Sequence, residues 1–245
     1  CRATTRVPAH PPGVYQFMTR TLRAAVIAGA TSLALLPGAA FAQTYSHVDA
    51  AGDMFDDAGA AVAATNGDVT NVAVNYTKKR ITITTSYTDL DASGSNAVAG
   101  AYVVVNAING RSFVLGAAAD ATGTHKLYMR SKGKAKACYR KLKVAVDTDL
   151  NTITLSAPSS CVASSKRVVL GGFGMSNDGS VDAAGDPIFA NDDAFLDGVP
   201  PTADTVGMSP VIARGGTGVV VDPAARIARP GLAKALAKAK ALAAR

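Results

Sequence analysis

The segment Leu142-Lys-Val-Ala-Val-Asp-Thr-Asp-Leu-Asn-Thr-Ile-Thr-Leu-Ser-Ala157 alternates apolar and polar residues on both sides of a polar centre. Alternation with a period of two is typical of β-strands that bury one face. A turn centred on residues 149–150 sets Val144 opposite Leu155, so the apolar faces of the two strands coincide. The segment therefore predicts a β-hairpin.

The same register brings two cysteines together. Carried outward, it sets Leu142 opposite Ala157 and then Cys138 opposite Cys161. In an exported chain an even pair of cysteines indicates a disulfide, which would stabilise a hairpin of this size by about 3 kcal/mol in the chain-entropy model. Pro158 cannot donate a ladder hydrogen bond, so it predicts a sheet edge or a strand end. A function for the free thiols is the alternative interpretation.

Two more hairpins are expected upstream. Pairing Tyr76 with Ile81 also brings two apolar faces together. Asn109-Gly110 lies between two apolar runs and favours a type I′ turn, because both residues tolerate positive φ. Period-two patterns predict additional strands at 125–130, 166–170, 205–213 and 217–222.

Composition agrees with an all-β fold. Hydrophobic residues make up 48% of the chain and aromatic residues only 6%, and Glu, a strong helix former, is absent. We expect a single antiparallel β-sandwich, jelly-roll-like, over 43–222. A short cationic tail, helical or disordered, is expected to follow over 223–245.

The first part of the chain has the layout of an export signal. Residues 18–42 start with Met, carry two Arg, continue through the uncharged apolar run 24–36 and end in small residues before Gln43. The apolar run is too short for a bilayer core of about 30 Å, which argues against an anchor. We therefore expect cleavage before Gln43, a secreted or envelope-associated product without a transmembrane segment, and no structural role for upstream residues 1–17.

The basic charge lies at the two ends of the sequence. The formal net charge is +7, but residues 1–42 hold four Arg and no acid, and 222–245 hold six cations and one Asp. The body is therefore slightly acidic. This balance argues against a general nucleic-acid-binding domain.

An internal repeat supplies candidate metal ligands. Val-Asp-Ala-Ala-Gly-Asp occurs at 48–53 and again at 181–186, each time followed by a Phe and then by an Asp pair. Clustered loop carboxylates can coordinate calcium, although Asp and Gly also form ordinary turns. The candidate calcium ligands are Asp49, Asp53, Asp182 and Asp186. A second loop, 89–94, begins like a calcium loop but has Gly100 where an EF-hand needs its bidentate Glu.

A run of cations at 125–143 contains no acid. It could hold an anionic polymer such as a phosphate-bearing wall polymer, or it could simply protect a sheet edge. The candidate ligand-binding residues are Tyr128, Tyr139, Lys132, Lys134 and Lys136. The Ala- and Lys-rich tail is either a tether to an anionic surface or a solvated segment.

Signals for catalysis are weak. No nucleophile elbow, zinc-protease motif, paired-cysteine redox motif or phosphate loop is present. Two Asp could act as an acid/base pair, as in glycosidases, but nothing in the sequence singles out a pair. We expect a protein without enzymatic activity.

Three features together resemble a known group of proteins. They are the Asp-Ala-Ala-Gly-Asp opening at 49–53, the Tyr-Thr-Asp-Leu-Asp strand end at 87–91, and the hairpin that runs on to Ser-Ser-Cys at 159–161. Over about 44–200 the chain is similar to small secreted actinobacterial proteins, which in turn resemble DOMON and family 9 carbohydrate-binding β-sandwiches. This resemblance implies a jelly-roll binding module with calcium near the four candidate aspartates.

The functional hypotheses follow from these patterns. The first is a secreted, non-catalytic module that binds a glycan through exposed tyrosines and loop aspartates. The second is an envelope-associated structural or adhesion protein that docks to anionic cell-wall polymers through 126–143 and the tail. The third is a secreted hydrolase, which requires two Asp carboxyls to converge in a cleft.

Overall fold

The computed structural model describes residues 44–130, 136–199, 207–215 and 219–220. All of them belong to one compact unit. The expected export signal, the upstream residues and the cationic tail lie outside the described residues. The same holds for Lys132 and Lys134.

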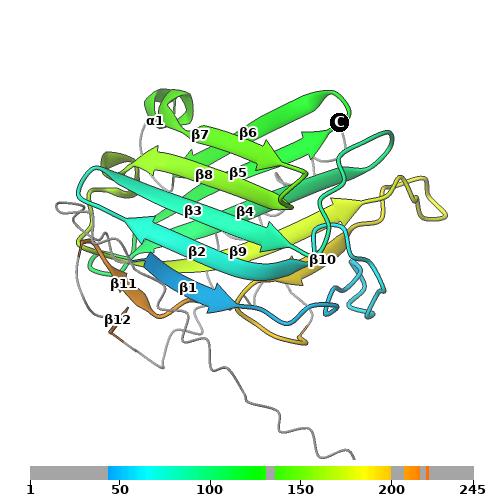
Figure 1. Ribbon diagram of the computed structural model, residues 1–245, viewed down its shortest axis with the longest axis horizontal. Helices are drawn as coiled ribbons and strands as arrows, with labels where there is room; N and C mark the ends of the chain where they lie inside the picture. The colour runs from blue at the N-terminus through cyan, green and yellow to red at the C-terminus, as the bar shows by residue number, and fades with distance from the viewer. Residues whose placement is uncertain (1–43, 131–135, 200–206, 216–218, 221–245) are drawn as a thin grey trace, which may run out of the picture. The chain divides into compact units, whose positions relative to one another are not determined.

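Two antiparallel sheets pack face to face as a sandwich (Figure 1), which confirms the expected fold class. The five-stranded sheet has the order β1 (Thr44–Val48), β2 (Val69–Tyr76), β3 (Arg80–Tyr87), β8 (Thr152–Pro158) and β7 (Lys143–Asp147). The seven-stranded sheet has the order β12 (Val219–Val220), β11 (Val211–Ala213), β9 (Arg167–Asn177), β4 (Ala97–Asn106), β5 (Ser112–Asp120) and β6 (Gly123–Arg130), with β10 (Ala190–Asp193) also paired to β9.

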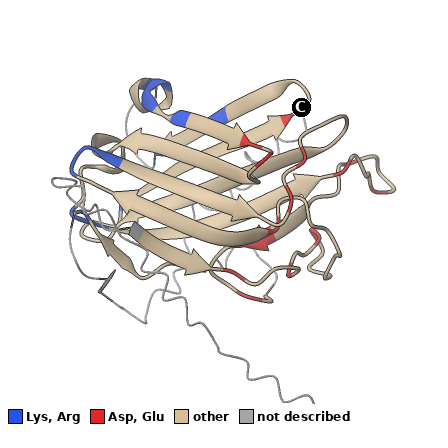
Figure 2. Cartoon of the chain, in the orientation of Figure 1, with Lys and Arg blue, Asp and Glu red and all other residues tan. Residues whose placement is uncertain are grey.

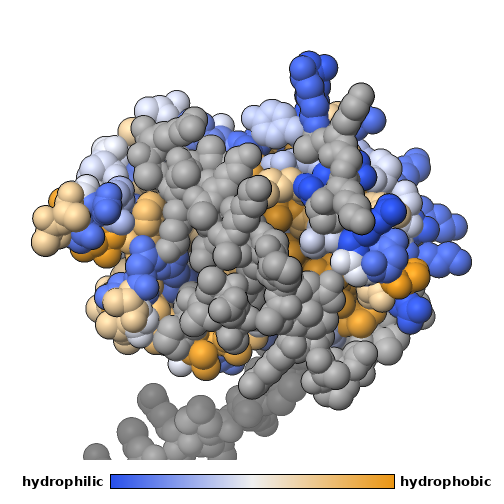
Figure 3. All heavy atoms as spheres, turned by 180° about the vertical axis from the view of Figure 1, so that it is seen from behind, coloured by the Kyte–Doolittle hydropathy of each residue, from blue (hydrophilic) through white to orange (hydrophobic). Residues whose placement is uncertain are grey.

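The main core lies between the sheets. Strands β2 and β3 alternate buried and half-buried residues, so their apolar faces point inward. The central strand β4 lies between β9 and β5 and is buried along its whole length. Its outer face carries a second apolar cluster that includes Phe173 and Met175, and Figure 3 shows hydrophobic side chains on this side of the molecule.

Two predicted registers are confirmed. Tyr76 pairs with Ile81 in the β2–β3 ladder, and Val144 pairs with Leu155 in the β7–β8 ladder. Pro158 is the last residue of β8, as expected for a residue that cannot donate to a ladder. Period-two burial therefore determined these pairings correctly.

The predicted turn at Asn109-Gly110 is wrong in type. The β4–β5 ladder ends at Val105 and Ser112, so a longer loop joins the strands. Gly110 has a φ of 67°, whereas Asn109 is absent from the residues with positive φ, and a type I′ turn needs both. The side chain of Asn106 accepts hydrogen bonds from the N–H groups of Ile108 and Asn109 and so stabilises this loop.

The disulfide forms, but not through a continued ladder. Cys138 lies in helix α1 (Lys136–Lys141) and Cys161 in the 3-10 helix η1 (Ser159–Val162), with their Cα atoms 5.6 Å apart. Leu142 therefore precedes β7 instead of pairing with Ala157, because the chain turns into α1 at this point.

The disulfide indicates an oxidising environment. Among the described residues, no helix has the length and apolarity needed to cross a membrane.

Strand β9 is longer than the expected 166–170, because glycines carry it through a crowded part of the core. A Cβ added at Gly172 would lie 2.9 Å from Cδ1 of Tyr102, and one added at Gly174 would lie 2.7 Å from Cγ2 of Val69. At Gly174, therefore, the absence of a side chain lets the start of β2 approach β9 closely. Strands β1 and β10 were not predicted, and both position the site described next.

Candidate functional site

Acidic side chains gather at one end of the sandwich. Figure 2 shows Asp residues around the loops that follow β1 and β10, whereas Lys and Arg lie mainly at α1 and the β2–β3 turn. Within this acidic end, two groups of side chains bring potential metal-ligand atoms within 4.8 Å of one another. One group is Asp53, Asp68 and Asp192, and the other is His47, Asp49 and Asp197.

The first group joins three segments of the chain. Asp68 immediately precedes β2, and both of its carboxylate oxygens accept hydrogen bonds from the N–H of Gly52, at 3.1 and 2.9 Å. The hydroxyl of Thr88 donates to the same carboxylate at 2.6 Å. These bonds fold the loop after β1 back against the start of β2, which brings Asp53 next to Asp68.

The other two carboxylates of this group are held by backbone donors. Asp192 in β10 accepts a hydrogen bond of 2.7 Å from the N–H of Val69, and Asp53 accepts one of 2.8 Å from the N–H of Gly198. The second oxygen of Asp53, Oδ1, is buried and has no hydrogen-bond partner. Asp68 and Asp192 are each only 1% exposed.

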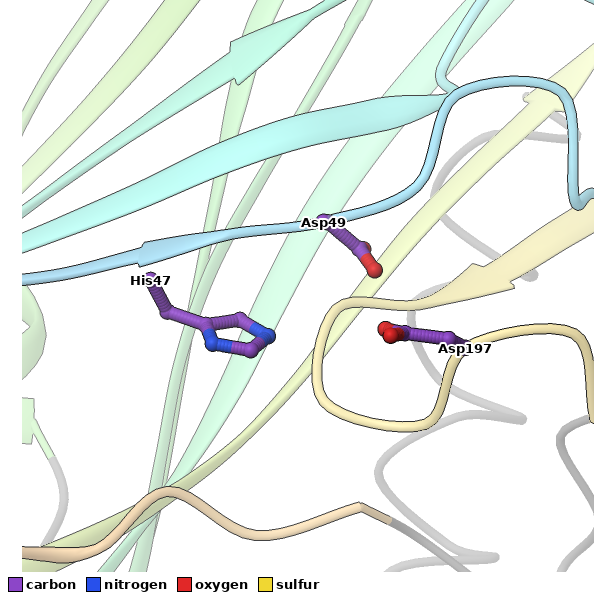
Figure 4. A group of neighbouring side chains, drawn as sticks. All are labelled: His47, Asp49 and Asp197. Atoms are coloured by element: carbon purple, nitrogen blue, oxygen red, sulfur yellow. The ribbon is translucent and has the colours of Figure 1, made fainter.

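The second group lies along the edge strand β1. Tyr45, His47 and Asp49 alternate with exposed residues, so all three face the inside of the sandwich. Asp197 belongs to the loop that follows β10 and is exposed. Figure 4 shows the carboxyl groups of Asp49 and Asp197 pointing toward each other, with the His47 ring beside them.

Burial of these like charges changes how they titrate. Burial, together with the neighbouring Asp192 and Asp197, raises the pKa of Asp49 to about 9. Burial also raises the pKa of Asp192 to about 8, with Asp53 and Asp68 contributing and the hydrogen bond from Val69 opposing.

Burial also changes the pKa values of two neighbouring side chains. Burial raises the pKa of Asp193 to about 6 and lowers the pKa of His47. In the described part of the chain, no Lys or Arg forms an ion pair with the carboxylates of either group.

The repeat splits between two environments. Asp49 and Asp53 belong to the buried groups, whereas Asp182 and Asp186 lie in an exposed turn between β9 and β10. There the carboxylate of Asp182 accepts hydrogen bonds from the N–H groups of Ala184 and Asp186, at 2.8 and 2.9 Å. The structure therefore does not bring the four candidate calcium ligands together.

Sequence reasoning missed four members of the two groups. His47, Asp68 and Asp197 stand in no motif, and they enter the site only because β1, the start of β2 and the loop after β10 meet there. Asp192 had a signal, since the Asp pair that follows the second repeat copy contains it.

The candidate ligand-binding residues are dispersed. Tyr128 is buried and donates a hydrogen bond of 2.7 Å to the carbonyl of Cys161, so its hydroxyl has a structural role. Tyr139 is 45% exposed, and Lys136 is exposed at the start of α1. Tyr87 and Tyr102 are likewise buried in the core and offer no ring for stacking on a sugar.

Comparison with known proteins leaves the site to be interpreted from its own chemistry. No family model matches the chain, and a search of curated proteins finds no match. The resemblance to secreted binding modules therefore rests on the sequence motifs alone.

Proposed function

We propose that this protein is an exported, non-catalytic binding module of the β-sandwich type whose acidic end holds a calcium ion at Asp53, Asp68 and Asp192. One observation carries the proposal: three carboxylates lie within 4.8 Å of one another, and two of them are 1% exposed. Burying like charges is costly unless a cation or protons neutralise them. A bound calcium ion carries two positive charges and so offsets most of the negative charge of the three carboxylates.

Calcium suits this group better than other common ions. All three side chains offer oxygen, and calcium accepts six to eight oxygen ligands in a flexible geometry, whereas magnesium demands a near-ideal octahedron. Asp53 and Asp68 belong to segments of the five-stranded side, and Asp192 belongs to β10 on the other sheet. Calcium would therefore join the two layers and order the loops around it.

Export and binding, not catalysis, fit the rest of the molecule. The disulfide and the leader-like segment 18–42 support an extracellular location. The carboxylates of Asp68 and Asp192 are buried and bonded to backbone N–H groups, so they are poorly placed to reach a polymeric substrate. This arrangement favours a structural ion over acid/base chemistry.

The class of ligand that the module binds is inferred from the resemblance and from which side chains are exposed. The resemblance to carbohydrate-binding modules implies a glycan, but burial of Tyr87, Tyr102 and Tyr128 leaves no stacking platform on these rings. The loops that the calcium ion orders at the acidic end are then the part of the molecule that would contact a sugar. Calcium-dependent retention on a glycan panel would support this ligand class, and retention in chelator would argue against it.

A second candidate is docking to anionic cell-wall polymers. Its support is the group of cations near α1, at the part of the sandwich away from the carboxylates (Figure 2). The described members are Lys126, Lys136, Arg140, Lys141 and Lys143. Binding to wall preparations should then weaken steeply as salt rises, because counterions are released.

Thermal unfolding with and without calcium tests the main proposal. A ligand that binds only the native state stabilises it by about 2.7 kcal/mol at a hundred times its Kd. We expect calcium to raise Tm and chelator to reverse the rise. An unchanged Tm over millimolar calcium would contradict the proposal.

The repeat supplies a matched control. Asp53→Ala removes a proposed ligand, and Asp186→Ala makes the same change at the corresponding position of the exposed copy. The calcium response should disappear in the first variant and persist in the second. Equal responses in both would place the ion elsewhere.

A further inference from the structure

The group of His47, Asp49 and Asp197 differs chemically from the calcium group beside it. It contains a nitrogen donor, and one atom from each of its three side chains lies within 4.8 Å of the others. Calcium and magnesium take oxygen ligands, whereas imidazole together with carboxylate suits zinc and other first-row transition metals. The two groups are therefore not equivalent positions for one kind of ion.

Two potential metal-ligand atoms of this group are buried and have no hydrogen-bond partner. Nε2 of His47 and Oδ2 of Asp49 have no hydrogen-bond partner, and Asp49 is only 5% exposed. A buried polar atom without a partner carries the full cost of its desolvation. The two atoms without partners belong to His47 in β1 and to Asp49, which directly follows β1, so a single ion between them satisfies both.

The surrounding chain orients the ligands. The ring of His47 stacks on Phe195, with 5.0 Å between centroids and 29° between planes. Phe195 donates its N–H to the carboxylate of Asp193, and the N–H of Leu196 donates to the Asp193 carbonyl. This short loop also carries Asp197, so the residue that stacks on the ring and the residue that faces it come from one segment.

We propose that His47, Asp49 and Asp197 form a second cation site that takes a zinc-like transition-metal dication. Bonds of about 2 Å hold the ligand atoms of such an ion about 3–4 Å apart, so small side-chain rotations close the site. Imidazole binds metal through a ring nitrogen, and no hydrogen bond occupies Nε2 of His47. Asp197 is exposed, so the remaining coordination positions face solvent.

This second cation site is distinct from the calcium site and does not require calcium to be bound. The test titrates Co²⁺, a spectroscopic substitute for zinc, into untagged protein in saturating calcium. We expect one equivalent of Co²⁺ to bind, with visible absorption bands of a low-coordinate site, and Zn²⁺ to displace it. No such bands, or bands that zinc does not displace, would overturn the proposal.

Matched variants locate the site. His47→Ala and Asp49→Asn should each weaken Co²⁺ binding by more than about tenfold, which corresponds to 1.4 kcal/mol. The controls are His125→Ala, at a histidine that faces Asp120 instead, and Asp182→Asn, at the position of the exposed repeat copy that matches Asp49. Neither control should change the affinity.

Asp197→Asn guards against misfolding, because this side chain is exposed and its replacement leaves the core intact. It should also weaken Co²⁺ binding while the calcium-dependent rise in Tm stays unchanged. Full Co²⁺ affinity in His47→Ala or Asp197→Asn would disprove this site without affecting the calcium proposal. Conversely, a wild-type protein that binds Co²⁺ but whose Tm does not respond to calcium would contradict the calcium site and leave the His47 site intact.

Discussion

The carboxylate of Asp192 accepts a hydrogen bond of 2.7 Å from the backbone N–H of Val69. Asp192 lies in β10, which pairs with the seven-stranded sheet, and Val69 begins β2 of the five-stranded sheet. The bond therefore ties the two layers of the sandwich together at its acidic end. The same carboxylate belongs to the proposed calcium site, so this one side chain both holds the two layers together and would bind the ion.

Two substitutions separate these roles of Asp192. Asp192→Asn keeps an oxygen that can accept from Val69 but removes the charge, so in chelator above about pH 8 we expect a higher free energy of unfolding than in the wild type. Asp192→Ala leaves the N–H of Val69 unpaired and should lower this free energy by about 1–3 kcal/mol. Urea unfolding followed by circular dichroism measures both, and a full calcium response in Asp192→Asn would contradict the proposed ligand set.

Stability of the metal-free protein should fall as the pH rises. The pKa values of Asp49 and Asp192, about 9 and 8, exceed the ordinary value of 3.8, so the native state binds more protons than the unfolded state between these limits. The stabilisation is complete below about pH 4 and is lost as the pH rises toward 9.

Tm measured in chelator between about pH 5 and pH 9 checks this dependence. Each 1 kcal/mol lost lowers Tm by roughly 2–4 °C for a domain of this size. Saturating calcium should flatten the decline, because the ion replaces the protons. A metal-free Tm that rises with pH would show that the carboxylates are not held as the structure places them.

The disulfide should be a major source of stability. Cys138 and Cys161 are 23 residues apart in the sequence, and closing a loop of this length stabilises by about 3 kcal/mol in the chain-entropy model. Reduction, or Cys138→Ser with Cys161→Ser, should lower the free energy of unfolding by this amount. Mass spectrometry after alkylation under denaturing, non-reducing conditions supplies the check, since alkylation of both thiols would show that the bond is not formed.

The close approach of the sheets should make Gly174 intolerant of a side chain. A Cβ there would overlap the carbonyl oxygen of Gly67 and lie 2.7 Å from Cγ2 of Val69. Gly174→Ala should therefore lower the free energy of unfolding by about 3 kcal/mol or more. Gly185→Ala is the control: its φ is +87° and nothing lies within 4 Å of the added Cβ, so only strain of about 1 kcal/mol is expected. Similar losses in both variants would argue against the close contact.

Tyr128 should prove structural and not ligand-binding. Tyr128→Phe removes the buried hydrogen bond to the Cys161 carbonyl and should cost about 1–3 kcal/mol of stability without changing retention on a glycan panel. Tyr139→Phe, at a half-exposed ring, should cost almost nothing. Denaturant unfolding and retention on the glycan panel are measured for both variants. Lost retention with unchanged stability in Tyr128→Phe would show that Tyr128 binds the ligand.

Features governed by neighbouring residues were predictable. Alternation with a period of two placed Tyr76 opposite Ile81 and Val144 opposite Leu155, because a slip of one residue would have turned the apolar faces to solvent. The all-β class and the cysteine pairing followed from the same pattern. The predicted pairing of Leu142 with Ala157 was wrong, because the chain forms helix α1 before β7 and is not a β-strand there.

The amino-acid sequence by itself determined the all-β class, the registers of the β2–β3 and β7–β8 hairpins and the disulfide partners, since a hairpin register depends on contacts between segments that a short turn joins. Only the tertiary structure decided which aspartates meet. Val69 and Asp192 are 123 residues apart, and their contact exists because glycines let the two sheets approach at that end. The two copies of one hexapeptide consequently lie in different environments: Asp49 is buried and Asp53 half-buried among other carboxylates, whereas Asp182 and Asp186 lie in an exposed turn. Packing across layers, which no local pattern encodes, made the difference.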